Sequence, residues 1–225
     1  MSFGNSQILG SSGNSVAGAP PALVPPTYVG SGPAALGLSG VAIQPGTASY
    51  YQGNLSVATS ATLGNGALRL TAVYIPVPCT LQQLFAEFTA AGDAASLFAT
   101  CIYADSGAGS PGSLLITGPT ISTGSGNAGT VATGGTPGVY AGTIPQVTLQ
   151  PGIYWIGGVI QGVTVTQPTM RTGLWSSSSL PATALPAANA QATSYSVGGI
   201  TGALPGSAGF GGSGITPARV GFRIV

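Results

Sequence analysis

Charge is the rarest property of this 225-residue chain, which has four arginines, three acidic residues, no lysine and no histidine. Charged residues make up 3% of the sequence, whereas an ordinary globular domain has about 25%. The absence of histidine and lysine excludes an imidazole base, a Schiff-base amine and a phosphate-binding lysine. Four arginines are too few for the basic stripe of a nucleic-acid-binding surface. We therefore expect no enzymatic activity, no cofactor, no metal and no nucleic-acid partner.

Long hydrophobic runs are also missing. The longest run of apolar residues and glycine, Gly152–Ile160, spans nine residues, whereas crossing a bilayer takes roughly 18. The segment Met1–Gln7 has neither a basic residue nor a hydrophobic stretch, so no secretory signal is visible. We therefore expect no membrane insertion.

Cysteine is scarce too, and the two that occur, Cys79 and Cys101, cannot form a disulfide scaffold or a four-ligand zinc site. Both lie in apolar segments that look like strands. We favour two buried thiols that pack as small hydrophobic side chains. A single cross-strand disulfide is the alternative.

What the chain does have is apolar residues in short runs between glycines and prolines. Hydrophobic residues make up 44% of the sequence, with 38 glycines and 18 prolines. Many short strands separated by Gly/Pro turns are typical of a β-sandwich or barrel. The predicted strands are Leu68–Ile75, Ser96–Tyr103, Ser113–Thr117, Gln146–Leu149, Gly152–Ile156, Val163–Thr166 and the closing segment Arg219–Ile224.

The composition divides the chain into an arm and a domain. Residues 1–49 carry no charge and are dense in Gly, Ser, Ala and Pro, which favours an extended arm. This arm has apolar side chains that a plain linker does not need, among them Phe3, Ile8, Leu9 and Tyr28, so we expect it to dock on a neighbouring subunit. Residues 50–225 form the predicted β-sandwich domain, with long loops over one end of it between residues 173 and 216.

One segment, Thr80–Thr89, fits two structures. Its apolar residues have helical spacing after a possible capping box, and they also alternate as in a strand. The strand places Leu84 and Phe88 inward and Phe85 and Glu87 outward. We favour the strand because the neighbouring segments are strands.

No motif indicates chemistry. Two matches to the dinucleotide-binding pattern, which begin at Gly124 and Gly209, lack the following helix and acidic residue that the site requires. Asp105 opens a Gly/Ser/Pro loop, where an Asx-turn is the expected role rather than a cation site. Glu87 and Asp93 are expected to be solvated edge charges rather than a glycosidase pair.

Aromatic residues are candidates for contacts. Tyr154 and Trp155 adjoin in a predicted strand, so one ring is expected to face the core and the other a ligand or subunit. Tyr50, Tyr51 and Trp175 could stack on a glycan or contact a partner.

A resemblance runs from Tyr50 to Val225. The segments that carry it are Tyr50–Tyr51, Leu68–Pro76, Cys79–Leu84, Ile102–Asp105, Ser110–Leu115, Val147–Trp155, Gly202–Pro205 and Pro217–Arg223. In their order and spacing these segments resemble a β-sandwich domain of virion surface proteins of tailed bacteriophages, which occurs in capsid decorations and fibres, tail fibres and minor tail proteins.

The resemblance implies a jelly-roll-like antiparallel sandwich, a homotrimer, and a structural role in the virion without enzymatic activity. Other capsid or tail subunits would be its partners, and the virion, assembled in the host cytoplasm, its location. Because only residues 1–49 precede the resembling region, we expect direct attachment to a shell or tail surface. The alternative is a tail-fibre head that binds a host receptor or surface glycan and mediates adsorption.

Overall fold

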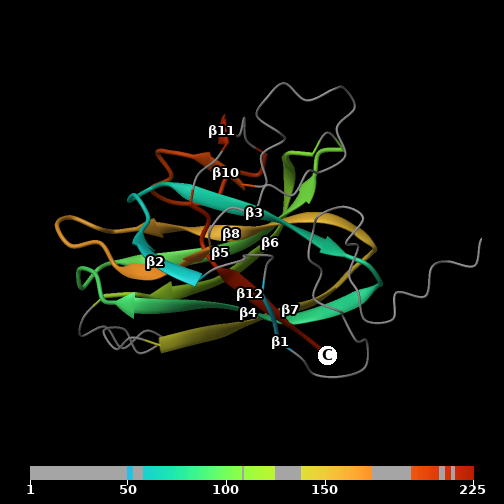
Figure 1. Ribbon diagram of the computed structural model, residues 1–225, viewed down its shortest axis with the longest axis horizontal. Helices are drawn as coiled ribbons and strands as arrows, with labels where there is room; N and C mark the ends of the chain where they lie inside the picture. Colours follow the sequence, from blue (N-terminus) through green and yellow to red (C-terminus); the bar gives the residue numbers. More distant parts are fainter. Residues whose placement is uncertain are drawn as a thin grey trace, which may run out of the picture.

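The computed structural model describes residues 50–52, 58–107, 109–124, 138–173, 194–207, 211–213 and 216–225 (Figure 1), and the predicted arm 1–49 lies outside them. These residues contain twelve strands and no helix. The strands are β1 (Tyr50–Gln52), β2 (Ala58–Thr62), β3 (Leu68–Ile75), β4 (Cys79–Ala90), β5 (Leu97–Asp105), β6 (Pro111–Ser122), β7 (Gly138–Leu149), β8 (Gly152–Gln161), β9 (Thr169–Gly173), β10 (Ser194–Val197), β11 (Gly211–Ser213) and β12 (Val220–Ile224). The predicted all-β fold is confirmed.

The strands form two six-stranded sheets in which all neighbours are antiparallel. Sheet A has the order β1-β12-β4-β9-β2, with β7 paired on β4, and sheet B has the order β11-β10-β3-β8-β5-β6. Within them, the sequences β1-β12-β4-β7 and β3-β8-β5-β6 follow the strand order of an eight-stranded jelly roll. The sandwich prediction is therefore confirmed down to its topology.

Four further strands are added to this jelly roll. The β2–β9 pair extends sheet A, and the β10–β11 pair extends sheet B beside β3. Strands β9, β10 and β11 all come from the long connection between β8 and β12, so this connection decorates both sheets.

An apolar core lies between the sheets. Alternation along each strand sends every second side chain inward, and the closing strand keeps its predicted pattern, with Val220, Phe222 and Ile224 buried. From sheet A, Phe88 meets Phe98 of sheet B edge-to-face, with ring centroids 5.6 Å apart. The other buried members include Leu84, Ala86, Ile102, Ile116, Ile121, Ile156, Ile160 and Met170.

The ambiguous segment is a strand, because it forms most of β4. Leu84 and Phe88 face the core as predicted, but Phe85 is only 6% exposed although it lies on the outer face of sheet A. Its partners across the neighbouring strands are Ala141 and Gly221. Such small neighbours leave room for the ring to lie against the sheet, so Phe85 points outward as predicted and is nevertheless buried.

The predicted strand Val163–Thr166 is a loop. Strand β8 ends at Gln161, and Gly162 then takes a positive φ of 73°, a conformation that suits glycine and turns the chain out of the sheet. The alternation of Val and Thr predicted a strand, but the backbone N–H groups of residues 164–166 bond to the carboxylate of Asp93 rather than to another strand.

A second apolar cluster covers the outer face of sheet B. Its buried members are Leu68, Leu70, Ala72, Cys101, Tyr103, Trp155 and Val159. Residues 198–207, which we call the strap, pack on this cluster through Ile200 and Leu204. This part of the predicted 173–216 loop region therefore crosses a sheet face rather than one end of the sandwich, and residues 174–193, 208–210 and 214–215 lie outside the described residues.

Sheet B is closely packed at its centre. A Cβ atom at Gly157 of β8 would lie 1.8 Å from the backbone oxygen of Arg69 on β3. Only glycine allows β3 and β8 to approach this closely at that position.

Candidate functional site

The seven residues predicted to contact partners or glycans are not assembled by the described part of the structure. The residues that lie outside it are Phe3, Ile8, Leu9, Tyr28 and Trp175. Tyr50 and Tyr51 lie on β1, which pairs with β12, and their side chains are not among those described. This contact set stays a prediction.

The three acidic side chains are all engaged within the fold, and Asp105 makes the predicted Asx-turn. Its Oδ2 accepts a hydrogen bond of 2.8 Å from the backbone N–H of Gly107. Its Oδ1 accepts a second bond of 2.8 Å from the indole Nε1 of Trp155, fifty residues away along the chain. The second contact was not predicted, since nothing in the sequence links the two residues.

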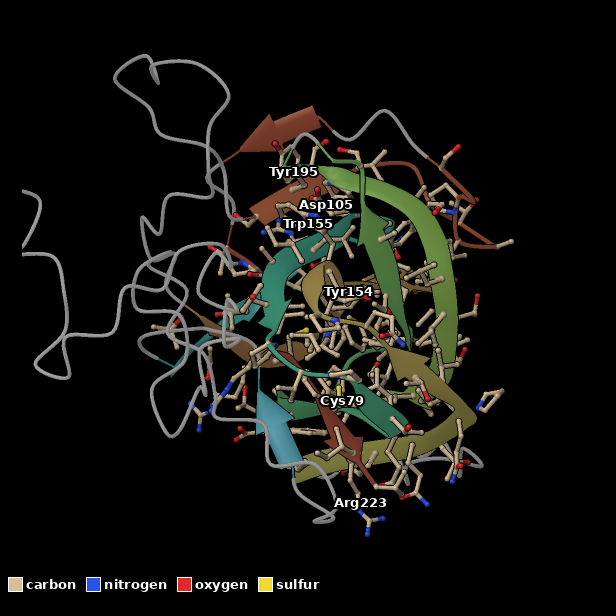
Figure 2. All side chains as sticks on the ribbon, turned by 90° about the vertical axis from the view of Figure 1, so that its right-hand side faces the viewer. Cys79, Asp105, Tyr154, Trp155, Tyr195 and Arg223 are labelled. Carbon is tan, nitrogen blue, oxygen red and sulfur yellow. The ribbon has the colours of Figure 1, made fainter. Side chains whose placement is uncertain are left out.

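Trp155 and Asp105 belong to a small polar and aromatic cluster on the outer face of sheet B (Figure 2). The ring of Tyr195 meets Trp155 edge-to-face at a centroid distance of 5.1 Å. Burial, followed by the nearby Asp105 charge, raises the pKa of Tyr195, so this phenol stays protonated and donates to the carbonyl oxygen of Gly109.

The adjoining aromatics Tyr154 and Trp155 do point to opposite faces, but neither ring is free. Tyr154 packs against the core between the sheets, and its hydroxyl donates to the carbonyl oxygen of Gln150. Trp155 is on the outer face and is completely buried. The predicted ligand or subunit contact by the outward ring is therefore wrong, because the second apolar cluster encloses that ring.

Asp93 organises the loop that follows β8. Its carboxylate accepts bonds from the backbone N–H groups of Val165, Thr166 and Thr164, and these bonds, in that order, lower its pKa well below the usual range. Three successive N–H groups aimed at one anion form a backbone nest. Asp93 is therefore an exposed carboxylate that also anchors this loop, a role that the sequence did not predict.

Glu87 is also partnered. Its Oε1 lies 3.0 Å from Nε of Arg171, on the outer face of sheet A. The two side chains are 29% and 35% exposed, so solvent weakens the pair. The sequence predicted a solvated edge charge, and the structure adds an ion pair with Arg171 that was not predicted.

The two cysteines are free and buried, as predicted. Cys79 belongs to the core between the sheets, where burial raises the pKa of its thiol to about 11. Cys101 belongs to the outer cluster of sheet B, where complete burial raises its pKa further. Neither thiol is a reactive nucleophile in the folded protein.

The strap is tied to sheet B by side chains that the sequence did not single out. Nε2 of Gln161 donates to the carbonyl oxygens of Ile200 and Gly202, at 3.1 and 2.8 Å. The hydroxyl of Tyr103 donates to the carbonyl oxygen of Pro205 at 2.8 Å. The sequence did hold one indication that this face of sheet B is covered, because the β5 segment is apolar on both faces, which is typical of a sheet buried on both sides.

The described residues contain no grouping suited to binding a metal ion. Among them, no three His, Cys, Asp or Glu side chains lie close enough to hold a metal ion. Within the same described ranges, no helix is long and apolar enough to cross a membrane. The chain matches no family model, no curated protein and no solved structure in the three comparisons made.

Proposed function

We propose that this chain is a structural component of a tailed-bacteriophage virion, a decoration or fibre protein of the capsid or tail surface. The segment 1–49 docks on neighbouring subunits, and the sandwich is presented beyond it. Two features of the chain support this proposal: the resemblance that extends from Tyr50 to Val225, and a jelly-roll topology, which is common in viral shells.

The observation that carries the proposal is that charged residues are few and that the acidic ones are bonded within the fold. Glu87, Asp93 and Asp105 are all bonded within the fold, and no charged residue occurs between positions 105 and 171. A free soluble domain usually keeps charges on its surface, which hold copies apart. A surface with so few charges fits a protein that is packed among other subunits, where little repulsion opposes assembly.

Quantitative mass spectrometry of purified particles tests the proposal. We expect the chain at a fixed copy number per particle, in a simple ratio to the major shell or tube protein. A copy number that varies between preparations, or that falls to zero after gradient purification, would remove the basis for a virion component. The proposed homotrimer is tested separately by the mass of the purified protein in solution.

The alternative, a head domain that binds a receptor or glycan, depends on exposed aromatic rings. Of the two tryptophans, Trp155 is completely buried and Trp175 lies outside the described residues. Glycan-array binding that is lost on Trp175→Ala would favour this alternative, whereas normal host adsorption by particles that lack the chain would exclude it.

A further inference from the structure

Arg69 is a partly buried cation that points toward the interior of the sandwich. Its neighbours on β3, Leu68 and Leu70, belong to the outer cluster of sheet B. Because side chains alternate along a strand, Arg69 points the other way, as does Val73, which packs against the core between the sheets. Burial lowers the pKa of the guanidinium, although an arginine stays charged at neutral pH.

The guanidinium finds few hydrogen-bond partners in its own chain. Its Nη1 donates to the carbonyl oxygen of Thr216 at 2.9 Å, at a position exposed to solvent. Its Nε is buried and has no hydrogen-bond partner. A single neutral acceptor does not balance the charge of a group that presents a rigid fork of N–H donors. The exposed end of this fork is within reach of another molecule.

No acidic side chain of the protein neutralises Arg69. The sequence has three acidic residues, and all three are among the described residues. Each is engaged elsewhere, since Glu87 pairs with an arginine on sheet A, Asp93 holds the loop after β8, and Asp105 binds an indole. The pair of Glu87 with Arg171 is the only ion pair within the described ranges. Any acidic side chain that neutralises Arg69 therefore belongs to another molecule.

The other three arginines are placed differently. Arg171 already has a carboxylate partner. Arg219 and Arg223 lie on the outer face of sheet A, since Val220 and the other alternate residues of β12 face the core. Figure 2 shows Arg223 directed away from the sandwich. Among the four arginines, all of which are described, Arg69 alone faces inward without a carboxylate.

We propose that Arg69 is a binding site for a carboxylate of another molecule. A partly buried charge without a counter-charge is unfavourable, and a carboxylate fits the fork of a guanidinium through two parallel hydrogen bonds. A phosphate fits less well, because it carries more negative charge than a single arginine balances. Ser196 of β10 lies opposite Arg69 in sheet B, so its hydroxyl is on the same side and is available to the bound group.

The carboxylate comes from one of two sources, an acidic side chain of a partner protein or a free small carboxylate. A second copy of this chain is a poor source, because its Glu87, Asp93 and Asp105 are engaged in the same way. The site follows from charge pairing within the sandwich and is independent of the proposed virion role.

NMR of the arginine Nε–Hε groups tests the site in the unmodified chain. The four arginines give four such signals, and the variants Arg69→Met and Arg171→Met each identify one of them by its loss. Sodium acetate is the probe, and sodium chloride at the same ionic strength is the control. We expect acetate, but not chloride, to shift the Arg69 signal and to slow its exchange with water. The Arg171 signal should stay in place, because that guanidinium already holds a carboxylate.

Two peptides distinguish the two sources. One is a glycine–serine peptide with a single central glutamate, and the other has glutamine in its place. If a partner protein supplies the carboxylate, the glutamate peptide should bind about tenfold more tightly than the glutamine peptide, the factor for a hydrogen bond to a charged group, and more tightly than acetate. Equal affinities of the glutamate peptide and acetate would assign the site to a small carboxylate. In either case Arg69→Met should abolish the binding.

Unfolding in urea tests whether Arg69 lacks a counter-charge. Arg69→Met keeps an apolar stem and removes a charge that has no carboxylate partner, so the midpoint should not fall. Arg171→Met is the matched control, because it is the same replacement but breaks the pair with Glu87, so its midpoint should fall.

Two results would overturn the proposal. If acetate and chloride shift the Arg69 signal equally, the guanidinium does not select a carboxylate. If Arg69→Met lowers the urea midpoint as much as Arg171→Met, the fold already satisfies the charge of Arg69. The acetate titration uses the unmodified chain, so it remains decisive even if a variant fails to fold.

Discussion

Replacing Trp155 with phenylalanine tests whether the outer face of sheet B is a true second core. The indole is completely buried, and its Nε1 donates the 2.8 Å bond to Asp105. Losing a hydrogen bond to a charged group costs about 1.5–3 kcal/mol. The smaller ring also buries less apolar surface, which adds about 1 kcal/mol at 25 cal/mol per Å². We therefore expect the free energy of unfolding to fall by about 3 kcal/mol.

The neighbouring residue supplies the control. Tyr154→Phe removes a hydroxyl whose hydrogen bond to Gln150 is exposed to solvent, so its cost should be about 0.5–1 kcal/mol. Equilibrium unfolding in urea, followed by circular dichroism, gives both values from the transition midpoints. If Trp155→Phe costs no more than Tyr154→Phe, the outer cluster does not stabilise the fold and the two-core description fails.

Three further predictions concern the sandwich. Asp93 has a lower pKa in the fold than in the unfolded chain, so it stabilises the fold above about pH 4, and that contribution is lost as the pH falls further. Asp93→Asn should therefore flatten the acid dependence of the urea midpoint. An unchanged pH profile would contradict the role of Asp93 as loop anchor. Gly157→Ala places a Cβ atom 1.8 Å from a backbone oxygen of β3 and should abolish soluble expression. Gly198→Ala is the control, because a Cβ atom there has no neighbour within 4 Å, and this variant should express normally. Equal yields of the two variants would refute the close approach of β3 and β8. Glu87→Gln breaks the partly exposed pair with Arg171 and should lower the free energy of unfolding by no more than about 1 kcal/mol. This loss should disappear in 1 M NaCl. A loss that does not depend on salt would contradict the ion pair.

The sequence predicted most of the long strands because the apolar residues that face the core recur along them in a regular pattern. The segment Leu68–Ile75 matches β3 at both ends, and the alternation of the closing segment marks the buried face of β12. The short strands β2 and β9 were missed because they are rich in Thr, Ser, Gly and Ala and carry no apolar alternation. Strand β10 alternates, with Tyr195 and Val197 on one face, but over only four residues. Their pairing partners, not their own residues, determine that they are strands.

Interactions between distant residues were the second limit. Val163–Thr166 alternates like a strand, but the backbone N–H groups of residues 164–166 bond to Asp93, 71 to 73 residues earlier in the chain. The bond between Asp105 and Trp155 is equally invisible in a single sequence. Of the predicted contact residues, only the backbone positions of Tyr50 and Tyr51 are described, on β1, so this set is still to be tested.

The scarcity of charge has a structural counterpart. Each acidic residue is placed where it stabilises a particular feature: a strand face for Glu87, a loop for Asp93 and a buried indole for Asp105. Only seven charged residues are available in all to keep molecules apart in solution. We expect a surface of this kind to be covered by other subunits, which is the core of the proposed function.

Electron cryomicroscopy of the purified particle tests that claim most directly. We expect density for a jelly-roll sandwich at regular positions on the capsid or tail surface, with its sparsely charged faces in contact with neighbouring subunits. A complete map in which other proteins account for all the surface density would contradict it.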